Sequence, residues 1–456
     1  MSRFQTATAA LLLAFALAGG AQAQPAADAA ASQASAASQA APAAAAASDA
    51  GGKLHIRPVD DAWRKSLPRD ADAATQAWLD RLSPEAVARS NAYFEGGYWL
   101  QLWDYLLGLG IAWLLLRRGL SARVRDWAQR VGRKPLLRDA IFGAFWSVAS
   151  SLLALPLDIY SGFVREHQYG MATQTFGPWF GEQLMVLGIN TLFAAISFAV
   201  LYAVFRRVGE RWWIWGTAVG IGMLMLVMLV MPVWIDPLFN TYKPVSDPVI
   251  KNAVLQLAKA DGVPIDNIYE FDASRQTTRV SANVAGIFGS ASVRLNDNLM
   301  RTTLPEIRAV MGHELGHFVM NHVWKGITQM AVLLFVGLAF AKWAMTRLLR
   351  RHGAAWGLRG VDDIASLPLL VAVFSTFTLL ATPIQNTMVR TQEIEADRFG
   401  LNLAREPIGE AEAFLKLTEY RKPDPSAFEE FVFYDHPSTR FRIHDAMRWR
   451  QEMGTP

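Results

Sequence analysis

The 456-residue sequence contains no cysteine. This absence excludes disulfide bonds, thiolate zinc sites and cysteine nucleophiles, so any metal has to be bound by histidine and carboxylate side chains. Charged residues are also scarce, at 18% of the chain against about 25% in an ordinary soluble domain, whereas 52% of the residues are hydrophobic. The formal net charge of +4 is too small to indicate a nucleic-acid partner. This composition argues against a single soluble globule and for a membrane protein.

The first 52 residues predict a secretory signal and a linker. Residues 1–23 have a basic start at Arg3, an apolar stretch and a small-x-small cleavage site at residues 21–23, with an uncleaved anchor as the alternative. Residues 24–52 form a disordered linker rich in Ala and Ser, because a tract without bulky apolar residues cannot offset the entropy lost on ordering. Residues 53–97 predict juxtamembrane helices, with a fresh helix start at Ser83-Pro84.

Six apolar blocks follow, each close to the ~20 residues that a helix needs to cross the hydrocarbon layer. The blocks are residues 98–116, 140–160, 184–205, 212–235, 327–345 and 365–383. We therefore expect a four-helix transmembrane region over residues 98–235 and a transmembrane hairpin over residues 327–386.

Arginine and lysine are concentrated in alternate loops between these blocks. The first, third and fifth loops are rich in arginine, whereas the second has little beyond Arg165. The positive-inside rule places the odd loops in the cytoplasm. Residues 236–326 and 384–456 then share the opposite side of the membrane.

The strongest motif is His313-Glu314-Leu315-Gly316-His317, an H-E-x-x-H element. A capping box at residues 303–306 begins its helix, which we expect to continue to about Val323. Positions four apart lie on one helix face, so both imidazoles can bind one Zn²⁺ ion while Glu314 reaches the water on the metal. The alternative is a pair of helix histidines with a purely structural role.

A third zinc ligand is expected outside this helix. His322 follows His317 too closely to complete the longer three-histidine motif, which leaves a distant carboxylate. Glu393 is the best candidate, because Asp397 one helical turn later can accept the outer N–H of a liganding histidine. Glu395 remains the alternative ligand.

Together these motifs resemble the type I CAAX prenyl endopeptidases, integral-membrane zinc metalloproteases of the gluzincin kind, and their bacterial relatives such as the heat-shock membrane proteases. The resemblance extends from about residue 95 to the end. Its motifs are residues 156–160 with 163–176, 231–232 with 237–240, 281–283, 313–317 with 321–322, 393–397, and 436–437 with Arg442.

The resemblance implies roles for some of these residues. One zinc ion per chain is bound by His313, His317 and Glu393, Glu314 is the general base, and Asp397 orients a ligand. The remaining implied residues contact the substrate. Ser281, Ala282 and Asn283 pair with an extended peptide, and His436 and Arg442 lie near the substrate or the developing oxyanion. Without the resemblance, His436-Pro437 is read as a turn and Arg442 as a surface charge.

The predicted fold is mainly α: a polytopic membrane helix bundle with a zincin-like metalloprotease domain that carries a small β-sheet. The two halves of that domain are residues 236–326, which contain short β-like runs, and residues 387–456. The predicted function is peptide hydrolysis by a membrane-embedded zinc metalloendopeptidase. Rival functions are an inactive zinc-dependent membrane chaperone, which would be expected to lack part of the motif set, and a transporter, which would place its ionisable residues in the block centres.

The predicted partners are a peptide or protein substrate and the lipid bilayer, with no nucleic acid. The resemblance implies cleavage of a prenylated C-terminal motif, and misfolded or membrane-inserted proteins are the alternative substrates. The predicted location is the bacterial inner membrane. Eukaryotic members of the family have a metal site that faces the cytosol, whereas the arginine-rich loops and the signal-like segment predict that this site faces the periplasm.

Overall fold

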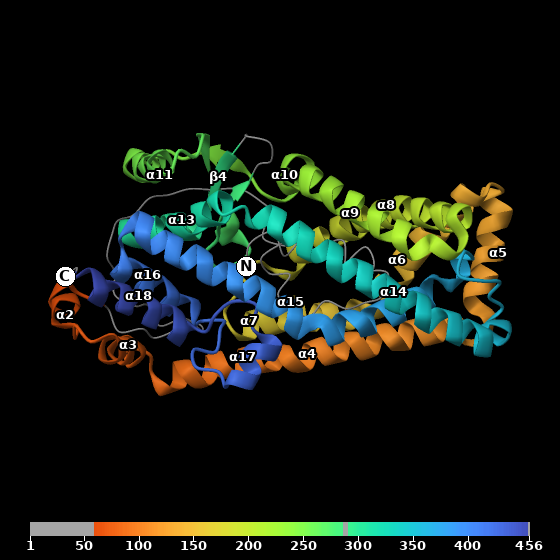
Figure 1. Cartoon of the computed structure of the whole chain (residues 1–456), viewed down its shortest axis with the longest axis horizontal. Helices are drawn as coiled ribbons and strands as arrows, with labels where there is room; N and C mark the ends of the chain where they lie inside the picture. The colour runs from red at the N-terminus through yellow and green to blue at the C-terminus, as the bar shows by residue number, and fades with distance from the viewer. Residues whose placement is uncertain (1–58, 286–290, 455–456) are drawn as a thin grey trace.

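The structure, a computed structural model, describes residues 59–285 and 291–454 (Figure 1). The predicted signal at residues 1–23 and the linker at residues 24–52 lie outside the described residues. Long helices run side by side along the longest axis of the molecule, and one helix, α5 (Leu120–Gly132), crosses their end (Figure 1).

The described residues contain five helical stretches that are long and apolar enough to cross a membrane. The long helices in these stretches are α4 (Pro84–Leu116), α6 (Pro135–Ile159), α8 (Phe176–Val208), α9 (Trp212–Val230), α14 (His322–Trp356) and α15 (Leu367–Ala404). The third stretch, Phe176–Phe239, holds both α8 and α9. Two of the six predicted blocks are therefore parts of one continuous helical stretch.

This third stretch nevertheless folds back on itself. A short 3-10 turn, Gly209–Arg211, separates α8 from α9. The ring of Phe205 lies 4.6 Å from that of Trp212, while Ser197, two turns earlier, contacts Met223, which lies much later in the chain. The second contact joins residues that lie farther from the turn on both sides than the first contact does. This pattern is that of two antiparallel helices. Length and hydropathy of the stretch alone do not reveal this reversal.

A small mixed sheet lies near the other end of the bundle. Its strands are β1 (Tyr242–Pro244), β2 (Ile265–Phe271), β3 (Ala282–Ala285) and β4 (Ala291–Asn296), in the order β1-β2-β4-β3. The β2 and β4 strands are parallel, and the two outer pairs are antiparallel. Strand β3 is therefore an edge strand. The shorter helices around the sheet are α7 (Arg165–Gln168), α10 (Asp236–Phe239), α11 (Pro248–Ala260), α12 (Asp297–Met300) and α13 (Leu304–Val319).

The N-terminal helices α2 (Asp61–Ser66) and α3 (Ala71–Leu79) pack against the C-terminal part of the chain. Their core is built around the fully buried Trp78, which shares a hydrophobic cluster with residues of α16 (Pro407–Leu417) and α18 (Thr439–Met453). The remaining short helix is α17 (Ala427–Phe433). Within residues 53–97, the buried Trp78 thus ties α3 to the C-terminal helices, and the juxtamembrane placement of this segment stays a prediction.

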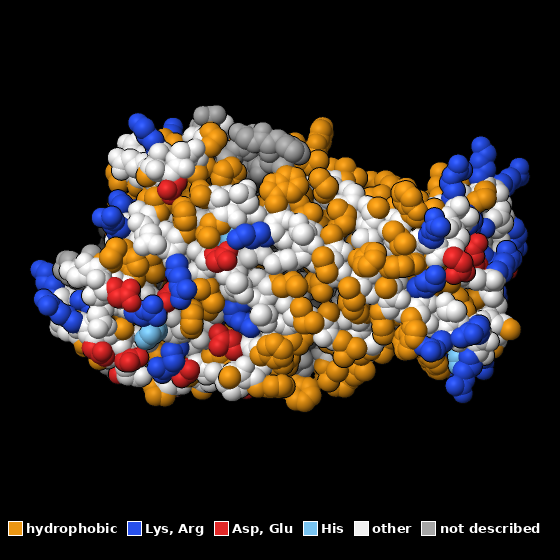
Figure 2. All heavy atoms as spheres, in the orientation of Figure 1, with side chains coloured by type: hydrophobic (Ala, Val, Ile, Leu, Met, Phe, Trp, Pro, Cys, Tyr) orange, Lys and Arg blue, Asp and Glu red, His pale blue; other side chains and the backbone are white. Residues whose placement is uncertain are grey.

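The predicted segment boundaries at residues 97 and 386 both fall inside long helices, α4 and α15. Helix α15 also continues through Pro383, where the sequence predicts the end of a block. Each of these helices is thus shared by the bundle and the domain at its end. Figure 2 shows the corresponding surface, in which an apolar band separates a mixed-charge end from an end rich in lysine and arginine.

Candidate metal centre

Helix α13 carries the H-E-x-x-H motif and begins as the sequence predicts. The Thr303 backbone N–H and hydroxyl both donate to the Glu306 carboxylate, in a capping box with Pro305 in the first turn. The helix ends at Val319, four residues before the predicted end. Asn321 has a left-handed backbone with φ +56°, a conformation that Asn tolerates better than most residues, and α14 begins at His322. The chain therefore turns sharply just after the motif.

Small residues bring α13 against α15. A Cβ atom built on Gly400 would lie 2.7 Å from the backbone nitrogen of His313, and one on Gly316 would lie 3.2 Å from the Cα atom of Ala396. A Cβ atom built on Gly312 would lie 3.0 Å from the carbonyl oxygen of Gly400. The two helices thus touch backbone to backbone. This close approach positions the motif histidines opposite the carboxylates of α15.

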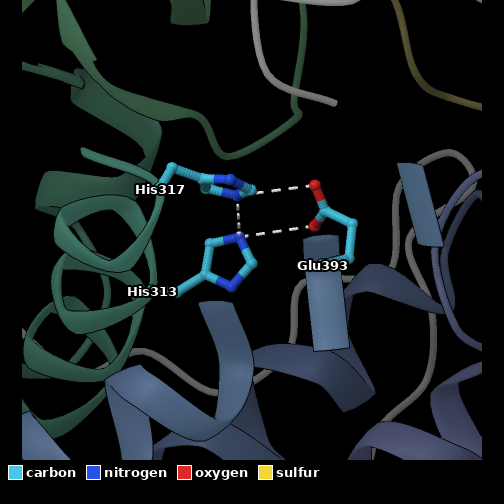
Figure 3. A group of neighbouring side chains, drawn as sticks. All are labelled: His313, His317 and Glu393. Carbon is cyan, nitrogen blue, oxygen red and sulfur yellow. Dashed lines mark hydrogen bonds and ion pairs between the residues drawn. The ribbon is translucent and has the colours of Figure 1, made fainter. Parts of the chain in front are cut away.

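His313, His317 and Glu393 converge on one point (Figure 3). The two Nε2 atoms lie 3.0 Å apart, and each lies 3.4 Å from one oxygen of the Glu393 carboxylate. Glu393 is only 3% exposed, and its Oε2 atom forms no hydrogen bond of normal geometry among the described residues. Three side chains from two helices therefore direct polar atoms at a common centre.

The hydrogen bonds behind His313 fix which of its nitrogens faces that centre. The His313 Nδ1–H donates to Oδ1 of Asp397 at 2.7 Å, as the sequence predicts. The Nε2 atom of neutral His313 then presents a lone pair toward His317 Nε2 and Glu393. Three electron-rich groups at such distances repel unless a cation lies among them. The donor set of two imidazoles and one carboxylate fits a zinc ion with an open fourth position.

The pKa values of the two histidines also indicate that the centre needs a positive charge. Burial alone would lower the pKa of His313, but hydrogen bonds to Asp397 and Glu393 outweigh burial and raise the pKa to about 10. Burial lowers the pKa of His317 to about 3. Without a metal, one proton on His313 therefore supplies the positive charge that the centre needs.

Asp397 is held from its other side by Arg442. The guanidinium donates from Nε to Oδ2 at 2.8 Å and from a terminal nitrogen to Oδ1, and it lies over the ring of Phe414. Both charged side chains are buried. The guanidinium of Arg442 thus supports the carboxylate that orients His313, and the expected position of Arg442 near the substrate or the developing oxyanion stays a prediction.

His436 lies directly beside the centre. Its Nε2 atom is 3.1 Å from Oε2 of Glu393, and Nδ1 contacts Asp435 at 2.9 Å. Burial and the positive charge of Arg421 lower the pKa of His436. A buried imidazole therefore lies within hydrogen-bond distance of the Glu393 carboxylate.

Glu314 follows His313 on α13 and is half-buried. Burial raises the pKa of its carboxyl to about 7, with Glu393 adding to the rise and His313 opposing it. A carboxyl with this pKa exchanges protons readily near neutral pH.

Edge strand β3 lies beside α13 and contains Ala282 and Asn283, while Ser281 directly precedes it. Asn283 is 6% exposed, yet neither polar atom of its amide has a hydrogen-bond partner among the residues that the structure describes. The structure thus brings one edge of the sheet close to the metal-binding helix and leaves a buried amide unpaired there.

Glu395, the alternative ligand, lies away from the centre. Its carboxylate contacts His322 Nε2 at 3.0 Å and Lys325 Nζ at 2.7 Å. Sequence reasoning assigned no role to His322 or to the small residues at the helix crossing. The repeated four-residue spacing of Gly312 and Gly316, and of Ala396 and Gly400, is the signal that predicts such a crossing.

Comparison with known families matches two adjacent family models to this chain. Residues 65–241 match the CAAX prenyl protease N-terminal region with five membrane helices, and residues 244–450 match peptidase family M48. Together the two models span the membrane helices and the metal centre.

Individual relatives agree with these matches. The chain is 28% identical to the Bacillus subtilis metalloprotease YhfN over 75% of this chain and 82% of the relative. It is 27% identical to CAAX prenyl protease 1 of Saccharomyces cerevisiae over 65% of this chain and 69% of the relative. The crystal structure of S. mikatae Ste24p has the same fold, with a TM-score of 0.69, 21% identity, and coverage of 81% of this chain and 90% of that chain.

Proposed function

The chain belongs to peptidase family M48 and is a membrane-embedded zinc metalloendopeptidase, and from this premise we propose roles for its individual residues. His313, His317 and Glu393 bind the zinc ion, and Glu314 is the general base. The observation that carries this proposal is the convergence of two imidazole Nε2 atoms and one buried carboxylate on a single point, where all three ligand atoms lie within 4.8 Å of one another.

Zinc, when bound, polarises the scissile carbonyl and acidifies the attacking water. Glu314 takes a proton from that water and returns it to the leaving amine. Its raised pKa, about 7, suits both steps, because the same group has to be deprotonated first and protonated later. No covalent intermediate with the protein is required.

We propose that the substrate binds as an extended strand along β3. An edge strand offers backbone groups that can pair with a peptide, and the amide of Asn283, which has no partner within residues 59–285 and 291–454, can add a side-chain hydrogen bond. His436 lies next to Glu393 and is placed to contact the carbonyl oxygen of the scissile bond. Asp397 and Arg442 act through His313 and are positioning residues.

The distribution of charge supports a periplasmic site in a bacterial inner membrane. Exposed basic side chains gather at the end of the bundle where α5 lies, opposite the end that holds α13 (Figures 1 and 2). These side chains are Arg117, Arg118, Arg123, Arg130, Arg133, Lys134, Arg207, Arg211, Arg347, Arg350, Arg351 and Arg359. The positive-inside rule assigns this end to the cytoplasm.

The proposed substrates are proteins that present an extended segment at this side of the membrane, including misfolded membrane and envelope proteins. Prenylated C-terminal motifs are the alternative, because several relatives carry the name CAAX prenyl protease 1.

Native membranes containing the parent protein are compared with membranes containing Glu314→Gln by mass spectrometry of peptide fragments. Fragments that require Glu314 identify the substrates, and equal fragment sets in the two membranes refute the assignment of Glu314. A matched pair of peptides with and without a farnesyl group then distinguishes the two substrate classes.

A further inference from the structure

We infer that His322 and Glu395 hold His317 in the tautomer that directs its Nε2 lone pair to the metal. This inference rests on the proposed role of His317 as a zinc ligand. His322 and Glu395 are positioning residues in this arrangement, since neither reaches the centre itself.

Three polar contacts connect His317 to the protein surface. His317 Nδ1 lies 2.8 Å from His322 Nδ1, His322 Nε2 lies 3.0 Å from Glu395 Oε2, and Lys325 Nζ donates to the same oxygen at 2.7 Å. His322 is 3% exposed, whereas Glu395 and Lys325 are partly open to solvent. The buried imidazole therefore bridges a metal ligand and a surface ion pair.

The carboxylate sets the direction of the hydrogen bonds in this chain. A carboxylate only accepts, so His322 donates its Nε2–H to Glu395. The Nδ1 atom of neutral His322 then has a lone pair and accepts from His317 Nδ1–H. With its proton on Nδ1, His317 keeps Nε2 free as a metal ligand.

His313 has an equivalent support on the opposite side of the centre. There, His313 donates directly to Asp397, and Arg442 neutralises that carboxylate. On the His317 side, the imidazole of His322 lies between the ligand and the carboxylate of Glu395. Lys325 pairs with that carboxylate as Arg442 pairs with Asp397. Each motif histidine is thus oriented by a carboxylate that is itself paired with a cation.

The local backbone makes the second support possible. In an uninterrupted helix, His322 would lie five positions, or about 500° of rotation, past His317, away from its face. The left-handed conformation of Asn321 ends α13 and begins α14 in a new direction, so that the rings of His317 and His322 lie 5.0 Å apart at 72°.

Zinc affinity of the purified full-length chain in detergent, measured by competition with a chromogenic chelator, tests the inference. The variants are His322→Leu, His322→Asn, Glu395→Ala and Lys325→Met, with His317→Ala as the reference for loss of a ligand. His444→Leu is the control, because His444 pairs with Asp72 at the surface, away from the centre. Thermal unfolding of each metal-free variant reports on the fold.

His322→Leu and Glu395→Ala are expected to weaken zinc binding about 10- to 100-fold, as is typical when a partner of a metal-binding histidine is lost. His322→Asn, whose amide oxygen can accept from His317 Nδ1–H, is expected to restore most of the affinity. Lys325→Met should have a smaller effect, because this lysine contacts Glu395 and not the imidazole of His322, and the control should have none.

Parent-like affinity of His322→Leu would overturn the inference, provided that His317→Ala loses zinc. Equal losses in His322→Leu and His322→Asn, together with lower unfolding temperatures in the metal-free state, would also overturn it, because they indicate a packing role. If His317→Ala itself keeps zinc, the proposed metal site fails rather than the inference.

Discussion

A methyl group added at the crossing of α13 and α15 should weaken zinc binding although it contacts none of the three ligand side chains. In Gly400→Ala, the new Cβ atom would lie 2.7 Å from the His313 nitrogen and 3.0 Å from the carbonyl carbon of Gly312. Ordinary van der Waals contact begins at 3.4 Å, so the first contact is about 0.7 Å too short. Because both neighbouring atoms belong to the backbone, only separation of the two helices can relieve the clash.

The size of the effect follows from the strain. Overpacking of this kind typically costs about 1–3 kcal/mol. In the metal-free protein the helices can move apart, but zinc has to bring His313, His317 and Glu393 together again. If zinc restores the parent geometry, the full strain energy is subtracted from the free energy of zinc binding. The affinity then becomes about 5- to 150-fold weaker.

Gly188→Ala provides the matched control, because its Cβ atom would meet no other atom within 4 Å. Both substitutions lie inside helices and gain up to about 1 kcal/mol of helix propensity. Chelator competition measures zinc affinity for the parent and both variants. Parent-like affinity of Gly400→Ala would show that the crossing does not set the ligand geometry, and our explanation of how the site assembles would then fail.

Three further predictions concern the same centre. Glu314→Gln should bind zinc like the parent protein but lose peptidase activity by at least about 100-fold, since the general base is removed; parent-like turnover on a fluorogenic peptide would contradict this. Arg442→Leu should lower the free energy of unfolding by about 3–5 kcal/mol, because Asp397 keeps a buried charge without its partner. Arg398→Met, which breaks an exposed ion pair with Asp445, should cost only about 0–1 kcal/mol in the same denaturant titration. Zinc affinity should rise about tenfold for each pH unit between about 7 and 9, because the proton on His313, whose pKa is raised to about 10, has to leave as zinc binds; calorimetry in two buffers should detect its release.

Several features of the fold follow directly from local sequence. Blocks of about 20 apolar residues predict the long helices, and a capping box predicts the start of α13. The four-residue spacing of His313 and His317 puts both imidazoles on one face of that helix. The same rule places Glu393 and Asp397 on one face of α15, so a hydrogen bond from one of the liganding histidines to Asp397 could be predicted, and the structure identifies that histidine as His313.

Other features depend on contacts between distant segments. Sequence alone leaves Glu393 and Glu395 as competing ligands, because it does not say which face of α15 meets α13. It also predicts that α13 continues past Asn321, since a single left-handed residue has no strong signature in a helical pattern. The N-terminal helix α3 packs on α18 because Trp78 and its apolar neighbours on α3 are buried in one cluster with residues of that helix.

The sequence by itself therefore determined the membrane-spanning helices, the motif and the kinds of ligand, because helix periodicity and the chemistry of side chains are local properties. The tertiary structure decided which carboxylate joins the histidines, that Arg442 supports Asp397, and that His322 returns to contact His317. These outcomes depend on how closely two helix backbones approach and where the chain turns, and such distances arise only when the remote segments pack together.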